Sequence, residues 1–595
     1  MNLQVKRAKE LCVYLVQEVK KDGIVPTFKR GTAFLRRRTG KKRGRFLPFK
    51  SALEYQSAHY NKAWPVISIC VPIYNTPKNY LQEMINSVKV QTCPLWELCL
   101  ADASEGDECC KVISEYKDTR IKYVKIENIG ISANTNEAAK RATGEYLALL
   151  DHDDILSPNA VYEMSKAAYE QQSGFIYSDE ALFATDMTRP IVGHFKPDFA
   201  PDYLNCCNYI CHFAAFKRDL FWQVGGENPL CDGSQDHDLF LKLSEIEPPY
   251  HIPKVLYYWR VHEGSTSAGT AAKPYVANAA KAAINAHLSR IGANGNAVDG
   301  LFPSTYKVEY AIDNEPLVSI LIPNKDHIEE LEKALYSITQ KTSYKNYEII
   351  IIENNSSRSE TFAYYDALPL KYPMCRVVKY EGGFNFSAIN NFGARAAKGE
   401  YLLLLNNDVE VINGEWLFEM LSLSMQKGVG IVGAKLLYQD GSVQHAGVIT
   451  GLGGFAGHSH KYARGDGGGY MFRLGTVQDF SAVTAACLMI KKEIFSEVNG
   501  LDEGFAVAFN DVDFCLRVLG LGYRIVYTPY ARLYHYESKS RGQDTKGEAK
   551  LRFEKERERL AARYGKSLLH DRFYNPNLTL DREDFSENDV LPRDV

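Results

Sequence analysis

Short apolar runs that end in polar residues alternate along the chain with stretches whose apolar residues recur at helical spacing. The sharpest run ends at Leu150, because Asp151, His152, Asp153 and Asp154 follow it directly. Buried strands that alternate with helices are typical of a parallel β-sheet, so the pattern predicts an α/β fold. The expected strands of the first half are 66–72, 96–100, 121–126 and 146–150, and the expected helices lie near 80–90 and 130–143.

The same pattern returns in the second half of the chain. The stretch from Gly144 to Asp153 and the stretch from Gly399 to Asp408 share one length and one layout of apolar and acidic residues. A repeat of this length is too long for a solenoid and indicates two domains of one fold in tandem. Further pairs in the same order are the strands that end at Pro72 and Pro323, the helix-start acids Asp236 and Asp511, and the loop histidines His262 and His535.

The repeat divides the chain into five parts. Apolar residues at helical spacing near the start predict a helix there, and 274–300 reads as a helical connection. We expect a basic, helical N-terminal region at 1–63, a first domain at 64–300, a linker at 301–315, a second domain at 316–544 and a charged helical tail at 545–595.

The composition is that of an ordinary globular protein, with 45% hydrophobic residues, 24% charged residues and a net charge of −3. This charge gives no indication of nucleic-acid binding. Residues 29–50 contain many Lys and Arg and no acid, with apolar residues between them, which suits contact with anionic lipid headgroups. The alternatives are a solvated linker or a surface for a partner protein.

The 13 cysteines show no metal-binding spacing, which indicates reduced thiols. The start of the chain lacks the continuous apolar core of a secretory signal, and no run approaches the ~20 apolar residues that span a bilayer. We therefore expect a cytoplasmic protein, with peripheral contact to the inner face of the cell membrane as a further hypothesis.

The acids at the strand tips are the main candidate chemistry. The carboxyl ends of the strands in an open α/β sheet are where ligands bind, and carboxylate oxygens there suit Mg²⁺ or Mn²⁺ with a diphosphate. The first strand is followed by neither GxGxxG nor a P-loop, which disfavours dinucleotide-binding and P-loop sites. Considered singly, Asp236 and Asp511 are also typical helix N-caps, and a lone loop histidine is more often structural.

Taken together, these features resemble family 2 glycosyltransferases with a GT-A fold, over about 66–265 and 317–540. The resemblance implies inverting transfer of a sugar from a nucleotide-sugar. Asp151-His152-Asp153 resembles the family's DxD motif, in which the first acid faces the ribose and the metal site and Asp153 holds the metal. The second copy has Asn406 in the first place and keeps Asp408 for the metal. His262 and His535 resemble the family's late histidine, a metal ligand or diphosphate contact.

The resemblance also implies the remaining site residues. Asp236 and Asp511 stand where the family has its catalytic base, and Gln235 and Asn510 replace the acid before it. Ala101 stands where the family often has a first Asp, and Glu353 is expected to fill that place in the second copy. The expected nucleotide-sugar contacts are Pro72, Tyr74, Asn75, Asp102, Asn136 and Asp151 in the first copy, and Pro323, Glu353, Asn354, Asn391 and Asn406 in the second; Gln235, Thr484 and Asn510 are expected near the acceptor.

The glycine- and aromatic-rich stretch 451–462 reads as an acceptor loop or as an ordinary surface loop. It resembles bacterial rhamnosyl- and galactofuranosyl-type transferases of cell-surface polysaccharide synthesis. The resemblance implies a bifunctional enzyme that adds sugars from dTDP-rhamnose or a UDP-sugar to a lipid-linked glycan. The alternatives are one active domain beside a degenerate glycan-binding domain, or a carbohydrate-binding scaffold without turnover.

Overall fold

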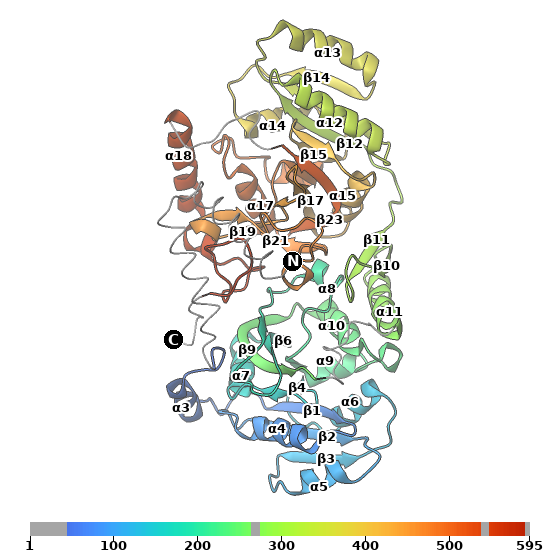
Figure 1. Cartoon of the computed structure of the whole chain (residues 1–595), viewed down its shortest axis with the longest axis vertical. Helices are drawn as coiled ribbons and strands as arrows, with labels where there is room; N and C mark the ends of the chain where they lie inside the picture. The colour runs from blue at the N-terminus through green and yellow to red at the C-terminus, as the bar shows by residue number, and fades with distance from the viewer. Residues whose placement is uncertain (1–43, 263–273, 537–546, 589–595) are drawn as a thin grey trace, which may run out of the picture.

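The computed structural model describes residues 44–262, 274–536 and 547–588. Two sheets, one from each half of the chain, lie one above the other in an elongated molecule (Figure 1). The first half forms the blue and green part of the figure, and the second half forms the yellow and orange part. The expected α/β class is therefore confirmed, with one large sheet in each half.

The first sheet has the strand order β3-β2-β1-β4-β8-β6-β9-β5, and β7 pairs with β6 at its side. Its strands are β1 (Ile67–Ile73), β2 (Trp96–Asp102), β3 (Ile121–Lys125), β4 (Tyr146–Leu149), β5 (Ile155–Leu156), β6 (Phe175–Phe183), β7 (Val192–His194), β8 (Ala214–Lys217) and β9 (Tyr250–Arg260).

The second sheet repeats this order as β14-β13-β12-β15-β22-β17-β23-β16, with β18 on β17 where the first sheet has β7 on β6. The shared order confirms the internal duplication. The second half adds β21 beside β23 and a separate pair, β19 with β20. The strands are β12 (Val318–Asn324), β13 (Tyr347–Glu353), β14 (Cys375–Lys379), β15 (Tyr401–Leu405), β16 (Val409–Val411), β17 (Val429–Leu437), β18 (Val443–His445), β19 (Val448–Thr450), β20 (Ala456–His458), β21 (Gln478–Phe480), β22 (Cys487–Lys491) and β23 (Arg524–His535).

Strand direction decides which residues meet at the edge of each sheet. β1 is parallel to β2 and β4, and β12 is parallel to β13 and β15. β8 and β22 run antiparallel to β4 and β15. The carboxyl ends of the parallel strands and the residues just before β8 or β22 therefore lie at one edge.

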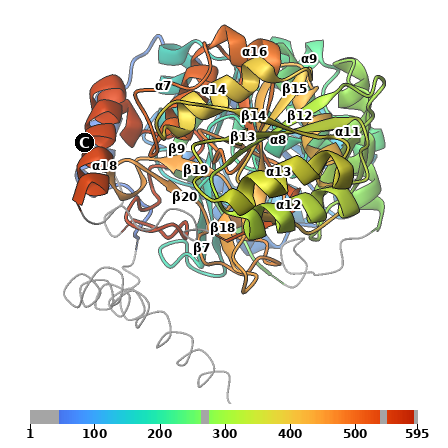
Figure 2. The same ribbon diagram turned by 90° about the horizontal axis from the view of Figure 1, so that it is seen from above.

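Helices cover both faces of the sheets. Figure 2 shows α12 and α13 together over the second sheet, with α14 on the other side of its strands. The helices of the first half are α3 (Lys50–Ala58), α4 (Lys78–Lys89), α5 (Glu108–Ser114), α6 (Ile131–Ala139), α7 (Ala160–Gln171), α8 (Pro201–Leu204), α9 (Arg218–Gln223), α10 (Gln235–Ile246) and α11 (Pro274–Arg290). Those of the second half are α12 (Ile328–Lys341), α13 (Ser359–Lys371), α14 (Phe386–Ala396), α15 (Trp416–Ser424), α16 (Lys492–Glu497), α17 (Asn510–Gly520) and α18 (Gly547–Tyr564).

The junction between the halves differs from the expected helical connection and linker. Residues beyond α11 form an antiparallel hairpin of β10 (Gly295–Asp299) and β11 (Tyr306–Tyr310), seen beside α11 in Figure 1. Alternate residues Tyr306, Val308 and Tyr310 are buried in an apolar cluster that holds residues of both halves. This alternation is a strand signal, so the expectation of a helix to residue 300 was wrong, and β11 lies within the expected linker 301–315.

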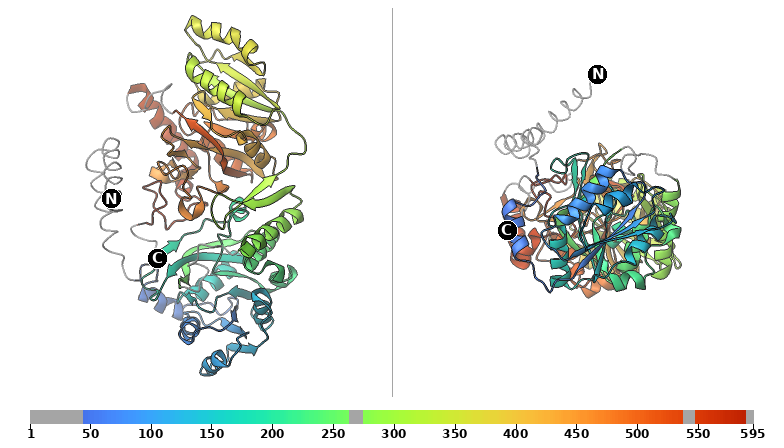
Figure 3. Two further views of the ribbon diagram at one scale, coloured as in Figure 1. Left: turned by 45° about the vertical axis from the view of Figure 1, so that its right-hand side comes forward. Right: turned by 90° about the horizontal axis from the view of Figure 1, so that it is seen from below.

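The tail after α18 ties the two halves together. Asn575 is buried, and its Nδ2 donates to Asp179 Oδ1 and Oδ2 in the first half at 3.0 and 2.9 Å. Asp571 Oδ2 accepts a hydrogen bond from the backbone N–H of Thr450 in the second half at 2.8 Å. Figure 3 shows from a further side how the second half rests on the first. The tail is thus part of the packed interior of both halves.

Residues 1–43 lie outside the described residues, so most of the basic run 29–50 does too. At its described end, Arg45 Nη2 donates to Glu587 Oε1 at 3.1 Å, and the ring of Phe46 meets Phe195 edge-on at 5.6 Å. These two side chains pack against the protein itself. No helix within the described ranges has the length and apolar character that a membrane crossing requires.

We predict that Asn575→Ala lowers the free energy of unfolding by about 1–3 kcal/mol, because buried Asp179 loses a donor. Asn588→Ala is the matched control, since its Nδ2 donates to carbonyls of the tail itself, at Pro576 and Leu578. Denaturant unfolding of both variants measures the difference. Equal effects at the two positions would contradict a tie between the halves through Asn575.

Candidate active sites

The acids beyond β4 fall into two groups. Asp154 is buried, and it accepts hydrogen bonds from Tyr257 Oη at 2.5 Å and from the Arg260 backbone N–H at 2.7 Å. Burial, with Asp151 and Asp153 nearby, raises the pKa of Asp154 well above its usual value. The side chains of Asp151 and Asp153 are 46% and 21% exposed. Asp154 therefore holds the turn, and the other two acids remain available for a ligand.

Each half pairs one strand-tip acid with one late histidine. His262 Nε2 lies 2.8 Å from Asp153 Oδ2, and His535 Nε2 lies 3.2 Å from Asp408 Oδ1. Two neighbouring ligands of an octahedral ion lie about 3.0 Å apart, because each bond is about 2.1 Å long. Both pairs therefore fit two positions around one Mg²⁺ or Mn²⁺ ion.

The network around His535 supports that fit. Its Nδ1 lies 2.6 Å from Gln444 Oε1, an acceptor, which assigns the ring proton to Nδ1 and leaves the Nε2 lone pair facing Asp408. Asn406 Nδ2 also lies 3.1 Å from that Nε2. Within the described ranges, no group of three or more His, Cys, Asp or Glu forms a complete metal site. The remaining ligands of an ion would come from phosphate oxygens and water.

The two histidines reach equivalent acids from different points of the chain. His535 lies inside β23 and pairs with Val409, whereas His262 lies two residues beyond the end of β9. Their expected match therefore holds for the acid that each contacts, and not for the position on the strand.

The expected bases lie where α10 and α17 begin. Asp236 Oδ1 accepts the backbone N–H of His237 at 2.9 Å, and its Oδ2 accepts Asn208 Nδ2 at 2.7 Å. Asp511 Oδ1 accepts the backbone N–H of Val512 at 2.9 Å. Asp511 Oδ2 accepts the backbone N–H of Ala485 at 3.3 Å. In both halves the segment before β8 or β22 thus contacts the helix-start carboxylate.

The three expected acceptor residues make local bonds. Gln235 Oε1 accepts from the backbone N–H of Gly233 at 2.8 Å, and the hydroxyl of Thr484 accepts from the backbone N–H of Ala486 at 3.4 Å. Asn510 is buried and donates to the Val507 carbonyl at 3.0 Å. Each of these three side chains therefore bonds to the backbone of a neighbouring residue in the sequence.

The residues of the first half expected to contact the nucleotide near β1 and β2 lie at the carboxyl ends of these strands, a region we call the nucleotide edge. Ser104 donates its backbone N–H to Asp102 Oδ1 at 2.9 Å, and Asn75 donates its own to Ser104 Oγ at 2.8 Å. Pro72 faces Ala101 in the ladder, and Tyr74 is exposed at the strand exit. These residues lie together at the edge that also carries the acids.

The second half corrects one expected equivalence. In the strand ladders Ile73 faces Asp102, and Asn324 faces Glu353, so Glu353 corresponds to Asp102 and not to Ala101. The serine that the strand-end acid binds stands one residue later after β13, and the longer Glu353 side chain still accepts the backbone N–H of Ser356. Pro323 corresponds to Pro72 in the same ladders. Sequence reasoning missed this because the bonded serine stands at a different distance from the end of each strand.

The carboxylates of Asp102 and Glu353 differ in how many of their oxygens accept hydrogen bonds. Asp102 Oδ2 accepts from Tyr123 Oη at 2.9 Å and from Lys125 Nζ at 3.3 Å. Glu353 Oε2, in contrast, is buried and has no hydrogen-bond partner among the described residues. The second half therefore offers a carboxylate oxygen that a nucleotide N–H or hydroxyl could satisfy.

The side chains of Asn136 and Asn391 bind loops. Asn136 donates Nδ2 to the Glu227 carbonyl at 2.8 Å and accepts the backbone N–H of that residue at 3.0 Å. Asn391 makes the same two bonds with Leu501, both at 2.9 Å. Asn354 similarly donates to the Gly382 carbonyl at 3.1 Å. This geometry favours loop positioning over direct contact with a donor.

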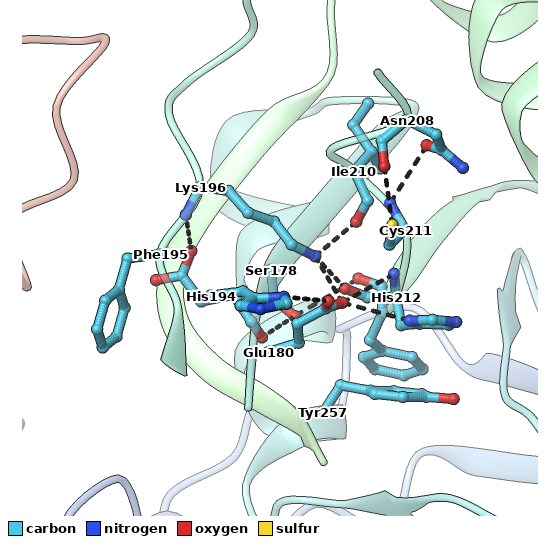
Figure 4. Close-up of polar contacts among 12 residues, drawn as sticks. Ser178, Glu180, His194, Phe195, Lys196, Asn208, Ile210, Cys211, His212 and Tyr257 are labelled. Carbon is cyan, nitrogen blue, oxygen red and sulfur yellow. Dashed lines mark hydrogen bonds and ion pairs between the residues drawn. The ribbon is translucent and has the colours of Figure 1, made fainter. Parts of the chain in front are cut away.

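Sequence reasoning missed a buried cluster around Glu180 (Figure 4). Glu180 on β6 lies 3.1 Å from Lys196 Nζ, 3.0 Å from His194 Nδ1 and 3.3 Å from His212 Nδ1. His212 Nε2 lies 3.5 Å from Asp151 Oδ2. Burial alone would raise the pKa of Glu180, but Lys196 and the two histidines hold it well below its usual value. The signal in the sequence was the pair of acids Asp179 and Glu180 inside the mostly apolar run 175–183.

In both halves the same strand tip gathers the residues expected to bind a nucleotide, an acid–histidine pair and a helix-start carboxylate, which is the set of residues that the sequence resemblance implied. Residues 68–225 and 319–496 match the model of the family described as glycosyl transferase family 2. The chain belongs to this family, with one matched region in each half. The resemblance seen in the sequence is thereby confirmed, as is the expected pair of α/β domains of GT-A type.

Curated relatives are similar over most of the chain. An uncharacterized protein of Sinorhizobium fredii, y4gI, is 42% identical over 88% of this chain and 58% of its own length. The O-antigen biosynthesis protein RfbC of Myxococcus xanthus is 35% identical over 87% of this chain and 41% of its own length. The chain thus spans less than two thirds of each relative.

Among solved structures, the chain resembles that of GalNAc-T7 with UDP, GalNAc and Mn²⁺. The TM-score is 0.36 and the identity 16%, over 44% of this chain and 50% of that one. A likeness this slight indicates neither a ligand nor a metal for this chain.

We predict that Asn136→Ala and Asn391→Ala lower the free energy of unfolding by about 1–3 kcal/mol each, because buried backbone groups lose their partners. The KM for the donor should stay unchanged. Denaturant unfolding and steady-state kinetics measure the two effects. A raised donor KM with unchanged stability would instead restore the nucleotide-binding role expected from the sequence.

Proposed function

We propose that this chain is an inverting, metal-dependent glycosyltransferase with two catalytic sites, one in each half. The observation that carries the proposal is the repeated acid–histidine pair, Asp153 with His262 and Asp408 with His535, at a strand tip. A carboxylate at a helix start, Asp236 or Asp511, accompanies each pair. Family membership supplies the reaction class.

The transfer would proceed in one displacement. The acceptor hydroxyl attacks the anomeric carbon, the bond from that carbon to the phosphate oxygen breaks, and the hydroxyl proton passes to Asp236 or Asp511. Attack opposite the leaving group inverts the anomeric configuration. A bound Mg²⁺ or Mn²⁺ would offset the negative charge that develops on the leaving nucleoside diphosphate.

The environment of each base suits this task. Asn208 holds one oxygen of Asp236, and the backbone N–H of Ala485 holds one oxygen of Asp511. Each carboxylate keeps a fixed orientation while its remaining lone pairs can accept a proton. Asp151 and Asn406 would contact the donor beside the metal pair, and the Asp102 and Glu353 edges would hold the nucleotide.

The donor and acceptor follow from resemblance alone. We propose rhamnose from dTDP-rhamnose, with a UDP-sugar as the alternative donor, and a lipid-linked glycan as acceptor. The O-antigen relative supports a role in cell-surface polysaccharide synthesis. Contact of residues 29–50 with the inner face of the membrane belongs to the same proposal.

A second candidate is one active half and one half that only binds. Asn406 in place of Asp151 favours it, because the second site then has one charge fewer beside its metal pair. In this candidate Asp408 and His535 still bind a nucleotide through a metal ion.

We predict that the chain releases nucleoside diphosphate from one member of a nucleotide-sugar panel when Mn²⁺ and an acceptor are present. Asp153→Ala and Asp408→Ala should each lose the activity of one site, because each removes a metal ligand. Asp466→Ala is the control, since Asp466 is exposed and pairs only locally with Arg464. Loss in one variant alone would favour the second candidate, and no release by the parent chain would contradict transfer.

We predict that Asp236→Asn and Asp511→Asn each lower the turnover of their own site by roughly 10²–10⁴-fold, the usual size of a general-base contribution. The donor KM should change little, because the amide keeps the shape of the carboxylate. Product analysis separates the two transfers. Full turnover in both variants would overturn the base assignment.

A further inference from the structure

Lys196 is a fully buried lysine just beyond β7 whose charge the transfer chemistry does not use. Its Nζ donates to Glu180 Oε2 at 3.1 Å, to the Ile210 carbonyl at 2.5 Å and to the His212 carbonyl. All three donors of the ammonium are thus engaged. A buried ion pair stabilises a fold little compared with apolar residues of the same volume, so another reason for keeping it is required.

The carbonyls that Lys196 binds belong to one short segment, Asn208–His212. The first residue of this segment donates its amide to Asp236 Oδ2 at 2.7 Å. The last places its imidazole Nε2 3.5 Å from Asp151 Oδ2. A single segment therefore contacts both the proposed base and the acid at the strand tip. The buried Lys196 ammonium binds the carbonyls of Ile210 and His212 in the same segment.

Glu180 also contacts the same segment, at His212. Its Oε2 accepts the backbone N–H of His212 at 3.2 Å, and it lies 3.3 Å from the Nδ1 of that ring. The ring also stacks on Tyr257, with centroids 4.7 Å apart (Figure 4). The imidazole thereby has little freedom to turn away from Asp151.

The second half has the same backbone without these charges. Glu180 faces His194 in the first sheet, and Leu436 faces His445 at the same place in the second. The ladders of β8 and β22 place Ala486 where the first half has His212. His445 Nε2 accepts the backbone N–H of Thr484 at 3.4 Å. Burial, with His458 and His535 nearby, lowers the pKa of His445 well below its usual value, so a neutral ring supports this segment.

The buried pair of Lys196 and Glu180 thus occurs in the half whose strand tip has Asp151. The neutral ring of His445 contacts the equivalent segment in the half that has Asn406. We propose that Lys196 and Glu180 are positioning residues of the first site. They fix Asn208–His212 so that Asn208 orients the base Asp236 and His212 orients Asp151. This inference rests on the proposed function, because it assigns these residues to the transfer carried out by the first half.

The test uses the full chain with Asp511→Asn, which confines turnover to the first site. The key variant is Glu180→Leu combined with Lys196→Met, which removes both buried charges. Leucine is chosen at position 180 because Leu436 holds the equivalent position in the second half. Asn208→Ala tests the contact with the base directly. The matched control is Lys435→Met, because Lys435 is a buried lysine of the second half that donates to the carbonyls of Gly465 and Leu474.

Nucleoside diphosphate release from the donor identified in the panel gives kcat and KM separately, and denaturant unfolding verifies that each variant folds. We expect the Glu180→Leu/Lys196→Met chain and Asn208→Ala to lower kcat about tenfold or more, because the base loses its orientation. The donor KM should stay within about twofold in Asn208→Ala and rise in the double variant, because Asp151 is proposed to contact the donor. Lys435→Met should keep kcat within about twofold.

A crystal structure of the Glu180→Leu/Lys196→Met chain supplies a readout that does not depend on turnover. We expect Asn208 to leave Asp236 and the ring of His212 to leave Asp151. Either a folded variant with unchanged kcat or a segment still in place would overturn the inference while the proposed function stands. A parent chain that never turns over would overturn the proposed function, and the positioning role would fall with it.

Discussion

Each half of this protein depends on one central strand that has a parallel neighbour on one side and an antiparallel neighbour on the other. β4 and β15 fill this position, and the strand-tip acids stand within a few residues of where each strand ends. The parallel neighbour brings the residues proposed to bind the nucleotide to that end of the sheet. The antiparallel neighbour brings the segment that contacts the helix-start carboxylate. Strand direction alone thus gathers residues that are far apart in the sequence.

One backbone arrangement carries two different charge patterns. The first half combines Asp151 with His212, Glu180 and Lys196, whereas the second combines Asn406 with neutral groups. The strand-end carboxylates also differ, because both oxygens of Asp102 accept hydrogen bonds, whereas Glu353 Oε2 has no hydrogen-bond partner among the described residues. A shared fold therefore does not imply a shared substrate.

The two halves also share their interior. The β10–β11 hairpin contributes to an apolar cluster with residues from both, and the tail inserts Asn575 beside Asp179. Arg524 Nε lies 2.6 Å from Asp202 Oδ2 across the same boundary. Asp179 directly precedes Glu180 and accepts the backbone N–H of Lys196 at 2.8 Å. The tail that joins the halves therefore lies next to the charged support of the first site.

The sequence by itself determined the strand and helix pattern, the duplication, the family and the acids and histidines at the strand tips. These follow from local periodicity and from the order of motifs, which a single chain displays directly. Only the tertiary structure decided that Glu353 corresponds to Asp102, that His535 lies within a strand and that 301–315 includes β11. It also revealed the support of Lys196 and Glu180 for the segment Asn208–His212. Such features depend on ladder register and on contacts between distant residues, and neither leaves a fixed spacing in the sequence.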